Sequence, residues 1–234
     1  MTFIISEIGV NWDGDLNLLQ EMIQESKKAG CDAVKFQSFN EKMIMNHPKK
    51  SHLMKCTINK SNIEQIHQIA KKSNIEWFST PMYPEAIDFL EPYVQRYKIR
   101  EFDGRRIINN LDSEIFSKIM KTDKEVIISS NVSPINCKFY EDEKIKWLYC
   151  VPKYPCKLED VNFNNLKKFD GYSNHSTELM VPLTAVALGA NVIEVHITSD
   201  KSKEFADNNV SFDYKQLNNL VKHIKTIDKI RPSK

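Results

Sequence analysis

Charged and polar side chains interrupt several short apolar segments of this sequence, at spacings that bring them to one face. Lys35 and Gln37 are two positions apart in VKFQ, and Glu194 and His196 are two apart in IEVHIT. Side chains two positions apart in a β-strand point to the same side of a sheet. More polar residues lie within or at the end of similar segments: Glu7, Asn11, Lys98, Ser129, Ser130, Ser173 and His175. Because a buried charge without a partner is costly, the set predicts mutual ion pairs, a bound ligand, or both.

Two histidines of this set have the chemistry of metal ligands. His175 and His196 stand in successive apolar segments, and Glu7 offers a carboxylate. Imidazole and carboxylate donors that leave coordination positions open suit a catalytic divalent ion such as Mn²⁺, Fe²⁺ or Zn²⁺. A single histidine in a strand is more often a hydrogen-bonded core residue, so the prediction depends on their joint occurrence.

The lysines and serines of the set predict an anion site. The ammonium groups of Lys35 and Lys98 and the hydroxyls of Ser129 and Ser173 are donors that bind phosphate or carboxylate. Beside a metal, these donors indicate an anionic, phosphorylated substrate next to a metal-activated carbonyl group.

The elements that must position these residues alternate between strands and helices. Short β-branched or aromatic segments predict strands at 2–10, 32–37, 76–80, 96–99, 125–130, 146–151, 171–174 and 192–198. Amphipathic stretches between them predict helices from the cap at Asp15 to Gly30 and at 84–90, 113–120, 160–168, 177–188 and 213–230. Eight such units predict a (β/α)8 TIM barrel of the α/β class, whose site lies at the carboxyl ends of the strands. An open doubly wound sheet is the rival, but the chain has only six glycines and no glycine-rich phosphate loop.

Two connections depart from the repeat. The segment 38–61 is predicted to be a long polar loop, and its His47 and His52 are expected at the surface unless they face the mouth of the barrel. The segment 132–143 is too short for a full helix, so a shortened or degenerate helix is expected after the fifth strand. Since no linker is visible, residues 1–234 are expected to form a single barrel domain.

Composition excludes several classes of protein. Hydrophobic residues make up 41%, and 33 basic residues face 31 acidic ones, which argues against a disordered chain and a nucleic-acid module. No apolar run approaches the roughly 18–20 residues of a membrane helix. The N-terminus lacks a basic region and is read as a strand and not a signal peptide. Five cysteines without CxxC spacing indicate a reducing compartment, so a cytoplasmic protein is expected.

Several segments together resemble the N-acetylneuraminate (sialic acid) synthase family. They are EIGVNWDGD (7–15), AVKFQ (33–37), YKI (97–99), VIISS (126–130), YCVPKYPC (149–156), GYSNHS (171–176) and AVALGANVIEVHIT (185–198). The resemblance implies a TIM-barrel transferase that condenses phosphoenolpyruvate with an aldose, such as N-acetylmannosamine or a related amino sugar. The implied products are a 2-keto-3-deoxy sugar acid and phosphate, formed by C–O cleavage.

The resemblance also implies a role for each site residue. It assigns the metal to His175 and His196, with Mn²⁺ the first expectation and Mg²⁺ or Co²⁺ the alternatives. Catalytic roles are implied for Glu7, Lys35, Lys98 and Asp103, of which Asp103 is an acid/base candidate. The implied substrate-binding residues are Lys35, Gln37, Lys98, Ser129, Tyr154, Ser173, Glu194 and Asp207. A homodimer is expected by analogy with the family.

The sequence departs from the family pattern mainly around the sugar. Trp12, Pro152 and Asn208 replace an expected His, Asn and His, Arg100–Glu101 replaces a Ser, and 104–107 resembles an insertion. The antifreeze-like domain of many relatives does not follow residue 234, so a separately encoded one is a candidate partner. Two alternatives therefore stay open: a metal-dependent aldolase or epimerase, and a non-catalytic or partner-dependent ligand-binding barrel derived from this family.

Overall fold

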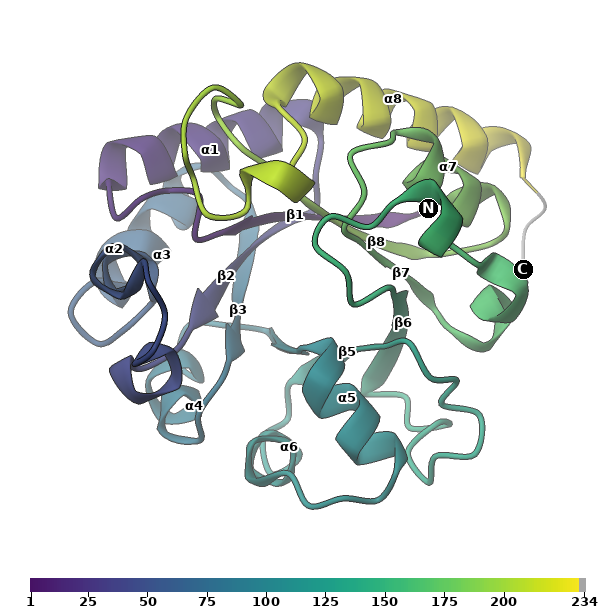
Figure 1. The fold of residues 1–234 in the computed structure, drawn as a ribbon, viewed down its shortest axis with the longest axis horizontal. Helices are drawn as coiled ribbons and strands as arrows, with labels where there is room; N and C mark the ends of the chain where they lie inside the picture. The colour runs from purple at the N-terminus through teal and green to yellow at the C-terminus, as the bar shows by residue number, and fades with distance from the viewer. Residues whose placement is uncertain (232–234) are drawn as a thin grey trace.

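Eight parallel strands pair in chain order and close into a barrel in the computed structural model, which describes residues 1–231 (Figure 1). The strands are β1 (Phe3–Gly9), β2 (Ala33–Ser38), β3 (Glu76–Pro81), β4 (Arg96–Ile99), β5 (Glu125–Ser130), β6 (Ile145–Cys150), β7 (Gly171–Asn174) and β8 (Val192–His196). The predicted (β/α)8 barrel is confirmed. Three strands have the predicted bounds and the others differ by no more than two residues, because their β-branched residues end where turn residues begin.

Helices surround the barrel. They are α1 (Leu16–Ala29), α3 (Ile63–Lys72), α4 (Glu85–Leu90), α5 (Glu101–Ile108), α6 (Glu114–Ile119), α7 (Met180–Ala187) and α8 (Tyr214–Ile230). The first and last of them begin and end at the residues that the sequence indicates, whereas the helices over 63–72 and 101–108 were not predicted. The Asp15 carboxylate caps α1 by accepting from the Asn17 amide at 2.8 Å, and Gly30 ends it with φ 93°. Asp213 and Gln216 form a capping box at the start of α8.

Three connections differ from the sequence-based expectation. The predicted polar loop 38–61 contains a 3₁₀ turn, η1 (Glu41–Ile44), and a short helix, α2 (Lys50–Cys56). Residues 104–107 are not an inserted loop but part of α5. The predicted helix 160–168 is formed by 3₁₀ turns, η2 (Leu158–Asp160) and η3 (Phe163–Lys168). Between β5 and β6, which lie within the described chain, turns replace a helix altogether, in agreement with the expected degeneracy there.

Strand register determines which polar side chains meet. β1 pairs with β8 and with β2, so Glu7 lies beside His196 on one side and Lys35 on the other. β7 pairs with β8 in the register that sets Ser173 beside Glu194. The intervening residues of β8 alternate to the opposite face and pack in the apolar core. The barrel therefore presents a polar interior at the carboxyl ends of its strands and an apolar exterior to the helices.

Gly104 allows α5 to lie directly on β5. A Cβ atom at this position would lie 2.1 Å from the carbonyl oxygen of Ser129, so only glycine permits this approach. Within residues 1–231, no helix is both long and apolar enough to cross a bilayer.

Candidate active site

A cavity of about 520 Å³ opens at the carboxyl ends of the strands. Side chains from all eight strands form its floor, and residues of several connections that follow the strands, those after β2 and β4 among them, form its mouth. It gathers eleven of the residues predicted for the site: Glu7, Lys35, Gln37, Lys98, Ser129, Tyr154, Ser173, His175, Glu194, His196 and Asp207. This position agrees with the general location of active sites in TIM barrels.

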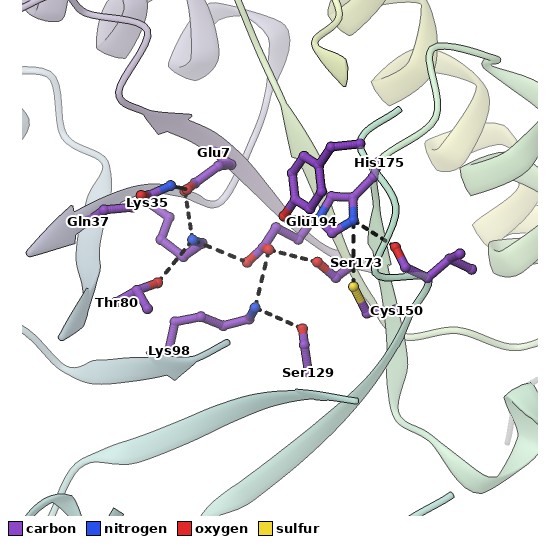
Figure 2. Close-up of polar contacts among 12 residues, drawn as sticks. Glu7, Lys35, Gln37, Thr80, Lys98, Ser129, Cys150, Ser173, His175 and Glu194 are labelled. Carbon is purple, nitrogen blue, oxygen red and sulfur yellow. Dashed lines mark hydrogen bonds and ion pairs between the residues drawn. The ribbon is translucent and has the colours of Figure 1, made fainter. Parts of the chain in front are cut away.

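The two buried lysines of the cavity are held by buried carboxylates (Figure 2). Lys35 Nζ lies 2.8 Å from Glu7 Oε2 and 3.9 Å from Glu194 Oε2. Lys98 Nζ lies 3.3 Å from Glu194 Oε1 and donates to Ser129 Oγ at 2.8 Å. Glu194 is thus shared by both ammonium groups. The sequence-based expectation of mutual pairing among these charges is met, and the cavity leaves room beside them.

Hydroxyl and amide groups complete this network. Ser173 Oγ donates to Glu194 Oε1 at 2.8 Å, and Lys35 Nζ donates to Thr80 Oγ1 at 3.2 Å. Gln37 Nε2 donates to Glu7 Oε1 at 3.0 Å (Figure 2). These neutral groups can turn to a bound anion without exposing an unpaired charge.

The carboxyl groups of the cavity differ in their tendency to ionise. Burial raises the pKa of Glu7 even though Lys35 partly offsets the effect, and burial likewise raises the pKa of Asp207. Burial also opposes ionisation of Glu194, but the ammonium groups of Lys35 and Lys98 outweigh it and hold the pKa of Glu194 below its ordinary value. The site therefore contains one fixed anion and two carboxyl groups that can carry a proton.

The two predicted metal ligands lie together above this network. The ring centroids of His175 and His196 are 5.3 Å apart. His175 Nδ1 donates to the Val151 carbonyl at 2.9 Å, which leaves the lone pair on Nε2 to accept from the Tyr154 hydroxyl at 2.7 Å. His196 Nδ1 is buried without a hydrogen-bond partner.

Both imidazoles are neutral in this environment. Burial, reinforced by the neighbouring His196, lowers the pKa of His175 to about 3. Burial also lowers the pKa of His196. Neutral rings beside the carboxyl groups of Glu7 and Asp207 are donors of the type that binds a divalent cation, which at His175 Nε2 would take the place of the Tyr154 hydroxyl.

One predicted residue lies elsewhere. Asp103 does not line the cavity, and its Oδ2 atom accepts from Arg100 Nε at 2.7 Å. Glu101, two positions earlier on α5, lines the cavity instead and lies 2.6 Å from Arg105 Nε. The role that the resemblance implies for Asp103 stays a prediction.

Further cavity residues were not selected from the sequence. Thr80, Arg100 and Glu101 stand at or just after strand ends, so the strand-end rule alone could have identified them. His47 and Lys49 reach the mouth from the connection between β2 and α3. No sequence pattern indicated that this connection folds back over the barrel.

The closed barrel and its polar cavity define a TIM-barrel enzyme with its site at the strand ends. The NeuB family matches residues 22–234, and the chain belongs to this family. It is 34% identical to the N,N′-diacetyllegionaminic acid synthase of Campylobacter jejuni over 97% of this chain and 77% of that protein. It is 29% identical to human N-acetylneuraminate-9-phosphate synthase over 97% of this chain and 70% of that protein.

A solved structure shares the fold over nearly the whole chain. The N-acetylneuraminic acid synthetase of Leptospira borgpetersenii, crystallised in complex with citrate, superposes with a TM-score of 0.85 at 28% identity. The match covers 99% of this chain and 87% of that one. The predicted family and the predicted class of enzyme, a transferase of the sialic acid synthase type, are confirmed.

Proposed function

We propose that this protein condenses phosphoenolpyruvate with the aldehyde of an open-chain amino sugar to give a 2-keto-3-deoxy sugar acid and phosphate. The observation that carries the proposal is the pair of buried ammonium groups, Lys35 and Lys98, that share Glu194 on the floor of the cavity. The names of the relatives, which are synthases of acidic amino sugars, support the same reaction.

Phosphoenolpyruvate fits the floor of the cavity by charge. Its phosphate and carboxylate would accept hydrogen bonds from Lys35, Lys98 and the serine hydroxyls beside them. The two lysines would then pair partly with the substrate and partly with Glu194. The raised pKa values of Glu7 and Asp207 favour this exchange, because protonation of these groups removes negative charge that would repel the substrate. Fixed ammonium groups in a buried site stabilise developing phosphate charge throughout the reaction.

The acceptor sugar would occupy the upper part of the cavity. His175 and His196 would hold a divalent cation, for which Mn²⁺ is our first choice, and this cation would supply Lewis-acid polarisation of the sugar carbonyl. The polar groups that could contact sugar hydroxyls are Gln37, Tyr154 and Asp207. The Tyr154 hydroxyl already donates to His175 Nε2.

Proton transfer in the reaction falls to the carboxyl groups. C3 of phosphoenolpyruvate forms a bond to the aldehyde carbon, the aldehyde oxygen takes a proton, and water adds at C2 with loss of a proton. Breaking the C2–O bond then releases phosphate and leaves the keto group. Glu7 can give and take these protons, because its pKa is raised and its carboxylate contacts Lys35 and Gln37.

The decisive experiment mixes the protein with Mn²⁺, phosphoenolpyruvate and a panel of N-acetylated, diamino and unmodified aldoses. We expect phosphate release that depends on an amino sugar, and a product whose mass is that of the sugar plus pyruvic acid. With ¹⁸O in the bridging position of phosphoenolpyruvate, C–O cleavage sends the label into phosphate. Lys98→Met is the inactive control.

Three other outcomes would overturn the proposal. Sugar cleavage or epimerisation without consumption of phosphoenolpyruvate would favour an aldolase or epimerase. Binding of phosphoenolpyruvate by calorimetry with no turnover, even after addition of a separately encoded antifreeze-like domain, would favour a ligand-binding barrel. Label retained in the sugar acid would exclude C–O cleavage.

A further inference from the structure

A second group of metal-ligating side chains lies outside the cavity. Asp13, His52 and Cys56 each offer one donor atom, and these three atoms all lie within 4.8 Å of one another. Among residues 1–231, no other group of three or more such side chains has its donor atoms this close together. The reaction proposed above uses none of the three.

Two segments that are distant in sequence hold these donors together. His52 and Cys56 are four positions apart in α2, so their side chains share one face of the helix. Asp13 lies in the turn after β1 with φ 57°, a left-handed conformation that is uncommon for a residue other than glycine. The neighbouring Trp12, 1% exposed, donates from Nε1 to the Cys56 carbonyl at 3.0 Å and fixes the turn against the helix.

The space between the two segments is narrow. A Cβ atom on Gly14 would lie 2.5 Å from Lys55 Cβ, so the turn packs directly on α2. Trp12 stands where the family resemblance leads us to expect a histidine. Its hydrogen bond to the Cys56 carbonyl holds the turn after β1 against α2. The packing of the turn against α2 therefore holds the three donors in place.

The contacts among the three donors leave the thiol without a strong partner. His52 Nε2 lies 2.7 Å from Asp13 Oδ1, while Cys56 Sγ lies 3.6 Å from the His52 carbonyl and near the backbone of Asp13. Cys56 is fully buried, whereas the side chains of His52 and Asp13 are 34% and 39% exposed. Burial, reinforced by the charge of Asp13, raises the pKa of the Cys56 thiol to about 12, whereas the charge of a bound cation favours the thiolate.

We propose that Asp13, His52 and Cys56 bind a Zn²⁺ ion. One carboxylate oxygen, one imidazole nitrogen and one thiolate sulfur form a donor set that this borderline-soft ion prefers. Binding releases the proton of the Cys56 thiol, and the thiolate and the Asp13 carboxylate then balance the two positive charges of the ion. The exposed side of the site opens to a hollow lined by both Asp13 and His52, which gives water access to a fourth position.

The ion would connect the outer wall of the active site to the barrel. The helix that carries His52 and Cys56 also carries Leu53, and Leu53 and Lys49 line the cavity. An ion that joins α2 to the turn after β1 would therefore fix this wall of the cavity. The role is structural and independent of the reaction, so it stands whether or not the proposed condensation is correct.

Titration of the full chain with Co²⁺, followed by visible and near-ultraviolet absorption, tests the site. We expect a thiolate-to-cobalt charge-transfer band that Zn²⁺ displaces at one equivalent. Cys56→Ser, His52→Ala and Asp13→Asn should each remove the band or weaken Zn²⁺ affinity by more than the roughly 10–100-fold typical of losing an outer-shell partner. Asp13→Asn is the most conservative of these, because asparagine tolerates a positive φ.

Two cysteine variants serve as matched controls. Cys31→Ser alters a buried thiol just before β2, at the other end of the barrel, and Cys150→Ser alters the thiol 3.7 Å from His175 Nδ1. Both should keep the band, and Zn²⁺ should slow amide hydrogen exchange of α2 in the unmodified protein but not in Cys56→Ser. No band in the unmodified protein, a band that survives Cys56→Ser, or a band lost in Cys150→Ser would each overturn the proposal.

Discussion

Replacing Lys98 with methionine removes one of the two ammonium groups that neutralise Glu194. The Glu194 carboxylate is then left with Lys35 at 3.9 Å and the Ser173 hydroxyl at 2.8 Å, in a site where both charges are almost fully buried. Loss of one partner from a buried ion pair costs about 3–5 kcal/mol, because the remaining charge keeps its desolvation penalty. We expect Lys98→Met to reduce the free energy of unfolding by this amount.

The double variant Lys98→Met/Glu194→Gln provides the decisive comparison. It removes both members of the pair, and Lys35 keeps Glu7 at 2.8 Å, so no charge is left alone. We expect its stability to return to within about 1–2 kcal/mol of the unmodified protein, while phosphate release stays absent. Urea unfolding followed by circular dichroism measures both values, and the cycle gives the coupling free energy.

A surface lysine supplies the matched control. Lys118 pairs with Asp88 at 2.7 Å, but both side chains are substantially exposed, so Lys118→Met should change stability by no more than about 1 kcal/mol. The reasoning is refuted if Lys98→Met is as stable as Lys118→Met, or if the destabilisation of the double variant equals the sum of the two single changes.

The pH dependence of stability gives an independent check on Glu194. Its pKa in the folded protein lies below the ordinary value of 4.5, so its contribution is present above pH 4.5 and is lost as the pH falls below that value. Stability of the unmodified protein should therefore fall more steeply below pH 4.5 than that of Glu194→Gln. Parallel curves for the two proteins would contradict the assigned ion pair.

Three further predictions concern the cation, the anion and the packing of the barrel. His196→Ala should abolish the response of phosphate release to added Mn²⁺ after chelation, while calorimetry still detects phosphoenolpyruvate; an unchanged response would remove this residue from the cation site. Arg100→Ala should raise the KM of an anionic substrate roughly tenfold, because Arg100 lines the cavity. A tenfold change corresponds to a loss of about 1.4 kcal/mol of binding free energy. Arg106→Ala in the helix that follows Arg100, where the guanidinium donates to the Asp112 carbonyl, should leave this KM unchanged. Gly104→Ala should lower the midpoint of thermal unfolding, because the added methyl would meet the Ser129 carbonyl at 2.1 Å.

Much of the barrel could be predicted because its signals are local. The strands 96–99, 125–130 and 171–174 are short apolar segments bounded by turn residues, and their observed bounds are those predicted. The strand-end rule then placed Lys35, Lys98 and Glu194 in one cavity before any contact was known.

The parts that could not be predicted depend on tertiary contacts. α2 has only seven residues, and a helix of this length is stable only when it is packed against the rest of the protein. α5 contains Gly104, and glycine is a weak helix former. Its role is to allow the close approach of α5 to β5, which the sequence alone does not reveal. The same helix brings Glu101 to the cavity, a placement that the sequence did not indicate. The approach of Asp13 to His52 and Cys56 likewise depends on how two loops meet.

The position of Glu194 between two ammonium groups has a consequence for selectivity. This carboxylate occupies the donors that the proposed substrate would engage, and so would compete with it. A chloride or acetate ion offers no more charge than the resident group and gains little by displacing it. A molecule carrying both a phosphate and a carboxylate could engage both lysines at once, so under the proposed function the site would select ligands by their number of anionic groups.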